Sequence, residues 1–88
     1  MMAQITHVEV TGPHRVALTF SDGTHGVVDL GPKILSWGGV FIPLHDPSFF
    51  AKVFVDHVGG TIAWPNNVDL DPDVLYEAAH AASVARDK

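Results

Sequence analysis

The chain of 88 residues has no cysteine, which excludes both a disulfide framework and a cysteine nucleophile. Small secreted domains usually compensate for a thin core with disulfides, so this absence favours a reducing, cytoplasmic location. Lysine and arginine are also scarce, because five basic residues stand against ten acidic ones and give a formal net charge of −5. The five are scattered, whereas binding to a nucleic-acid backbone needs a cluster, so we expect no direct contact with nucleic acid.

Long apolar runs are missing as well. No segment approaches the roughly 18 apolar residues that cross a membrane. The first residues, Met1 to Gln4, show neither the basic nor the apolar part of a signal peptide. Hydrophobic residues nevertheless make up 47% of the chain, which is sufficient for a core. We therefore expect a single domain over residues 1–88 that is cytoplasmic and makes no use of a membrane.

Several short segments between turn residues carry the strand pattern of β-branched or alternating apolar residues. We expect strands at residues 5–10, 14–21, 25–30, 52–57 and 61–64. Asp22-Gly23 is a signal for a two-residue hairpin of type I′ between the second and third of these strands. In that hairpin Leu18 would face Val27, and Ala17 would face Val28.

Two Asp-Pro pairs mark helix starts, because aspartate caps a helix well and proline suits the first helical position. Asp46 thus begins a short helix over residues 47–51, and another helical turn is expected at 33–37. Asp71-Pro72 begins a longer helix that should run to about Arg86, with a stripe of small residues that lets it lie close to a sheet: Leu75, Ala78, Ala79, Ala82 and Ala85. The predicted fold class is α+β, a small, mostly antiparallel sheet of about five strands with one longer C-terminal helix and short helical turns.

Catalytic and metal-binding patterns find little support. Asp69, Asp71 and Asp73 suggest a calcium loop, but Val74 and His80 stand where the EF-hand requires glycine and glutamate. The six histidines have no spacing that would bring three or four of them to one metal ion. No nucleophile elbow and no phosphate-binding glycine loop occurs. We therefore expect no enzyme, no metal site and no cofactor.

The most distinctive segment follows the last predicted strand. An aromatic ring, two amides, a carboxylate and a phenol come close together in the sequence there and form the predicted binding residues: Trp64, Asn66, Asn67, Asp69 and Tyr76. The structural alternative is that Trp64 closes the core while the polar residues brace the loop. Trp37 lies beside a glycine pair, and its side chain has the same two interpretations: packing in the core or an exposed contact.

The segment from Trp64 to Tyr76 reads Trp-Pro-Asn-Asn-Val-Asp-Leu-Asp-Pro-Asp-Val-Leu-Tyr. It resembles the closing signature of a small bacterial family, domain of unknown function 2442, and the order of the earlier segments agrees over about Ile5 to Ala79. The resemblance implies no catalytic residue, activity or cofactor. Asn67 stands where relatives usually have glycine, and asparagine tolerates the left-handed conformation that glycine would supply.

The resemblance also bears on partners. Some relatives are fused to a helix-turn-helix domain, but that fusion and its DNA binding are not implied for this chain. Others are similar to partners encoded beside small toxin-like proteins, which implies an antitoxin or adaptor role.

The leading hypothesis is a non-catalytic protein-interaction or regulatory module, antitoxin-like in one version, whose partner protein would then be a small toxin-like protein. The contact would be a sheet edge or the loop from Trp64 to Asp71, and an edge could also pair two copies into a homodimer. In the loop version, replacing Trp64 and Asp69 by alanine should abolish partner binding without unfolding the domain. Two alternatives stay open: a small-molecule or ion sensor that uses the region from Trp64 to Tyr76, and a small enzyme whose site forms at a dimer interface, with His25 or His57 as the acid–base residue.

Overall fold

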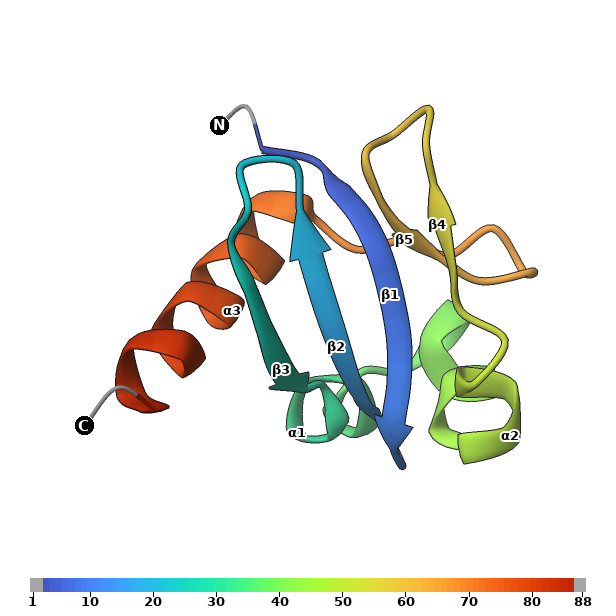
Figure 1. Ribbon diagram of the computed structural model, residues 1–88. Helices are drawn as coiled ribbons and strands as arrows, with labels where there is room; N and C mark the ends of the chain where they lie inside the picture. The colour runs from blue at the N-terminus through green and yellow to red at the C-terminus, as the bar shows by residue number, and fades with distance from the viewer. Residues whose placement is uncertain (1–2, 87–88) are drawn as a thin grey trace.

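The computed structural model describes residues 3–86, with side chains described for residues 3–80. Its strands form two small antiparallel sheets (Figure 1): one in the order β1 (Ile5–Gly12), β2 (Arg15–Phe20), β3 (His25–Asp29), and one of β4 (Phe54–Asp56) and β5 (Thr61–Ala63). The predicted α+β class, with five antiparallel strands and a longer C-terminal helix, is confirmed. The strands divide between two sheets instead of forming one.

Helical segments fill the connections between and after the sheets: α1 (Gly31–Ser36), the 3₁₀ helix η1 (Gly39–His45), α2 (Pro47–Phe50) and α3 (Pro72–Arg86). Both Asp-Pro starts are confirmed, because the carboxylate of Asp46 accepts the N–H of Ser48 at 2.9 Å and that of Asp71 accepts the N–H of Asp73 at 2.9 Å. No helix within residues 3–86 is long and apolar enough to cross a membrane.

The hairpin between β2 and β3 corrects the predicted register. Leu18 faces Gly26 and Ala17 faces Val27, one residue away from the expected pairs. The N–H of Gly23 donates to the carbonyl of Phe20, and only Gly23 of the Asp22-Gly23 pair has a positive φ, of 89°. The loop therefore has three residues and ends in a left-handed glycine. The Asp-Gly pair is compatible with this loop as well as with the type I′ turn that we expected. A one-residue slip exchanges the two faces of a strand, which is why Val28 and not Val27 is buried.

A second loop, after β5, has the same geometry. The N–H of Asn67 donates to the carbonyl of Trp64 at 3.0 Å, and the N–H of Trp64 donates to the carbonyl of Val68 at 2.9 Å. Asn67 holds the left-handed position with a φ of 69°, so the left-handed conformation expected for this asparagine is confirmed. The chain then runs back along β5 and pairs Ala63 with Asp69. The sequence predicted only a loop at this place.

Helix α3 lies against β3, and a glycine makes that close approach feasible. A Cβ atom added to Gly26 would lie 2.6 Å from the carbonyl oxygen of Ala79. Leu75 and Ala79 are buried against the core, as the predicted stripe requires, while the side chains of Ala82 and Ala85 lie outside the described residues. Figure 1 shows α3 running alongside β3 at one side of the molecule.

The other side of the three-stranded sheet is also occupied. The N–H of Ile5 in β1 donates to the carbonyl of Gly60 at 3.0 Å, and β1 contacts both β4 and β5. The second sheet thus adjoins β1, whereas α3 packs over the face of β3 at Gly26 (Figure 1). The sheet edge named as a contact in the leading hypothesis stays a prediction.

Candidate functional site

Trp64 lies in the core, with 1% of its surface exposed. Its indole N–H donates to the carbonyl oxygen of Phe50 at 2.9 Å, and the two rings pack with their centroids 5.5 Å apart. The ring of His14 lies on the other side of this pair, 5.0 Å from the Phe50 ring. A side chain enclosed in this way holds the loop in place and presents no surface to a ligand.

Asn66, Asn67 and Asp69 lie on the surface of the loop that Trp64 anchors. The amide of Asn66 donates to the carbonyl of Val40 at 3.2 Å, which ties this loop to η1. Together with Val40, Phe41 and Val68, these three residues line an open hollow of about 400 Å³, which we call the polar hollow. The structure thus brings three of the five predicted binding residues together, and leaves Trp64 and Tyr76 outside the lining.

Tyr76 points to the β2–β3 hairpin instead. Its hydroxyl donates to the carboxylate of Asp22 at 2.6 Å and accepts from the hydroxyl of Thr24 at 3.2 Å. Its ring meets Phe20 edge-on, with the centroids 5.1 Å apart. The hydrogen bond from Tyr76, followed by that from the Thr24 N–H, holds the pKa of Asp22 below its ordinary value of 3.8. Tyr76 therefore fastens α3 to the hairpin.

Replacing Tyr76 with phenylalanine should raise the pKa of Asp22 toward its ordinary value, because the largest cause of the lowered pKa is removed. A lowered pKa stabilises the fold above the unfolded-state pKa, and this contribution is lost as the pH falls through the folded-state pKa. The free energy of unfolding of the variant should therefore fall less steeply as the pH is lowered through the pKa of Asp22. A titration of the carboxyl groups followed by NMR measures the pKa of Asp22 in both proteins. Asp46, whose pKa is lowered by hydrogen bonds from Ser48, is the internal control and should not change. An unchanged Asp22 would contradict the assignment.

An apolar hollow lies between α1 and the first turns of α3. This α1–α3 groove has a volume of about 370 Å³ and a mostly apolar lining: Leu30, Lys33, Trp37, Leu70, Asp71, Val74, Leu75 and Ala78. Val74 is 46% exposed, so part of the lining faces solvent. A groove of this size and character accepts a few apolar side chains or a small apolar ligand.

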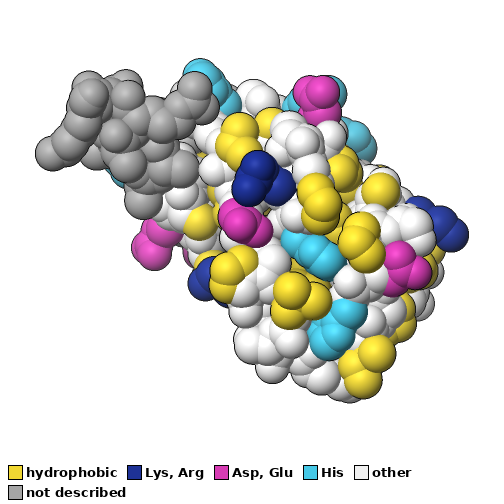
Figure 2. All heavy atoms as spheres, turned by 90° about the horizontal axis from the view of Figure 1, so that it is seen from below, with side chains coloured by type: hydrophobic (Ala, Val, Ile, Leu, Met, Phe, Trp, Pro, Cys, Tyr) yellow, Lys and Arg dark blue, Asp and Glu magenta, His cyan; other side chains and the backbone are white. Residues whose placement is uncertain are grey.

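Exposed apolar residues continue from the groove along α1 and η1. We call them the apolar strip, and they are between 37% and 65% exposed: Leu35, Trp37, Val40 and Ile42. Trp37 belongs to both the strip and the groove, and Val40 to both the strip and the polar hollow. Figure 2, which views the molecule from the side of α1 and α2, shows several apolar side chains on this face, interspersed with histidine and other side chains. An exposed apolar surface that extends over several residues in a small domain indicates an interaction site.

Local contacts hold the strip in place. The ring of His45 donates to the carbonyl of Trp37 at 2.8 Å, and the rings of Trp37 and Phe41 lie 4.7 Å apart. The ring of His14 donates to the carbonyl of Leu44 at 2.8 Å and so fastens η1 to the β1–β2 hairpin. These two histidines hold the backbone of the apolar strip in one conformation. A partner that binds the strip therefore loses less free energy to ordering it.

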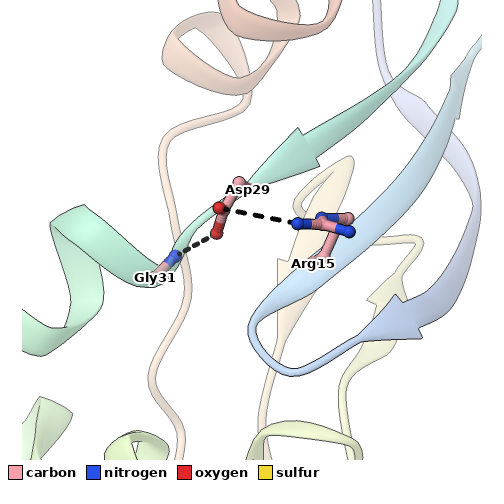
Figure 3. Close-up of polar contacts among 3 residues, drawn as sticks. All are labelled: Arg15, Asp29 and Gly31. Atoms are coloured by element: carbon pink, nitrogen blue, oxygen red, sulfur yellow. Dashed lines mark hydrogen bonds and ion pairs between the residues drawn. The ribbon is translucent and has the colours of Figure 1, made fainter.

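The start of α1 is fixed by Asp29 at the end of β3 (Figure 3). Its carboxylate accepts the N–H of Gly31 at 2.9 Å and lies 4.0 Å from the guanidinium of Arg15. Since both side chains of the ion pair are about half exposed, the pair itself contributes little. The hydrogen bond to Gly31 fixes the first residue of α1, the helix that contributes Lys33 to the lining of the α1–α3 groove.

Sequence reasoning missed the groove and the strip as a surface, although it singled out Trp37. The signal was present, because five large apolar residues between positions 35 and 42 flank a glycine pair without a strand or helix period. Within residues 3–80, no group of three or more histidine, aspartate or glutamate side chains is arranged to hold a metal ion.

The fold and this surface define a small α+β domain that displays an apolar groove. A family model described as "Protein of unknown function (DUF2442)" matches residues 5–81, and the chain belongs to this family. The match confirms the resemblance seen in the sequence and assigns no activity. No curated protein and no solved structure matches the chain.

Proposed function

We propose that the chain is a protein-binding module that engages a partner through the α1–α3 groove and the apolar strip. The observation that carries this proposal is the exposure of large apolar side chains on a surface held in place by hydrogen bonds from two histidines. Trp37 lies at its centre, between the groove and the strip, and partly exposed tryptophans are frequent energetic centres of interfaces.

Binding suits this surface better than catalysis. Among the described residues, Lys33 and Asp71 are the only ionisable ones that line the groove, and the carboxylate of Asp71 already caps α3. His25 and His57, the acid–base candidates from the sequence, do not line it. A regulatory role of the antitoxin kind, in which this surface masks a small toxin-like protein, is the version that the family resemblance supports.

A small-molecule sensor is the second candidate, and the polar hollow favours it. Asn67 and Asp69 line the hollow and form no side-chain hydrogen bond to another described residue, so they are available to a polar ligand. A thermal-shift screen with metal ions and metabolites tests this candidate, and a melting temperature that no compound raises would remove it.

Replacing Trp37 with alanine should abolish partner capture by the proposed module. The chain, with an affinity handle, is expressed in its native host, and proteins that purify with it in stoichiometric amount are identified by mass spectrometry. We expect the captured partner to be lost with Trp37→Ala, because truncating a central aromatic residue of an interface typically costs 2 kcal/mol or more, roughly 30-fold in affinity.

The matched control is Val58→Ala. Val58 is 97% exposed, also apolar, and lies in the turn between β4 and β5, outside the groove and the strip. The partner should remain bound to this variant. Equal capture by Trp37→Ala and the unmodified chain, with both folded by circular dichroism, would place the interaction elsewhere.

A further inference from the structure

We draw no further inference here: the strongest candidate, the outer edge of β3, where the backbone N–H and C=O groups of His25, Val27 and Asp29 point away from β2, carries nothing because nothing in the part of the chain that the structure describes shows what covers it.

Discussion

Trp64→Ala is expected to remove a large part of the stability of the domain. Removing a buried aromatic side chain costs about 3–5 kcal/mol, and a domain of this kind has roughly 5–15 kcal/mol to lose. Trp64 is 1% exposed, packs against Phe50, and bonds the carbonyl of Phe50 through its indole N–H. Urea unfolding followed by circular dichroism measures the change in the free energy of unfolding.

Trp64→Phe separates the contribution of ring packing from that of the indole hydrogen bond. It retains most of the ring contact but removes the N–H donor, so the carbonyl of Phe50 is left without this partner, at a cost of about 1–3 kcal/mol. A loss for Trp64→Ala no larger than that for Trp64→Phe would contradict the packing role. Because Trp64 is enclosed, the Trp64→Ala, Asp69→Ala double variant lowers stability as well as changing the surface, and it is unsuited to testing the loop as a contact. Trp37 is the tryptophan that tests binding.

Gly26→Ala should be the most damaging single-methyl change in the sheet. The added Cβ would lie 2.6 Å from the carbonyl oxygen of Ala79, and a backbone atom in α3 cannot turn aside as a flexible side chain can. Overpacking of this kind costs about 1–3 kcal/mol, which exceeds the 0.4–1 kcal/mol usually gained by stiffening the unfolded chain at a glycine. The net effect should be a lower melting temperature, measured by thermal denaturation.

Gly38→Ala is the matched control for this effect. No atom lies within 4 Å of the Cβ position at Gly38, and its φ of −110° is open to alanine. We expect unchanged or slightly raised stability there. Gly26→Ala should also displace α3 from β3 and so deform the α1–α3 groove, because Val74, Leu75 and Ala78 reach the groove from that helix. Equal melting temperatures for the two variants would show that α3 moves away at no cost.

The sequence predicts well those elements in which a residue and its neighbours strongly favour one local conformation. Asp46 and Asp71 cap helices in the only way an aspartate before proline can, and Asn67 is one of few residues that hold a left-handed φ. The family resemblance is likewise confirmed, by a family model that matches residues 5–81. In these cases each residue depends on neighbours within a few positions.

Predictions failed where the outcome depends on distant residues. Asp22-Gly23 supports both a two-residue and a three-residue loop, and burial of Val28 with Leu18 and Val16 on the core face decides between them. The predicted binding residues were grouped by sequence distance, whereas Tyr76 turns toward Asp22 because α3 lies against β3. The groove joins residues from positions 30 to 78, a proximity that no local pattern encodes.

The position of the apolar strip on helical segments has a consequence for this protein at high concentration. A chain that displays large apolar side chains risks aggregation most when those side chains stand on a bare strand that can template the addition of further chains. Here the strip lies on α1, on η1 and between them, and none of its four residues belongs to a strand. Two copies that meet through the strip would therefore make side-chain contacts without adding a strand to either sheet.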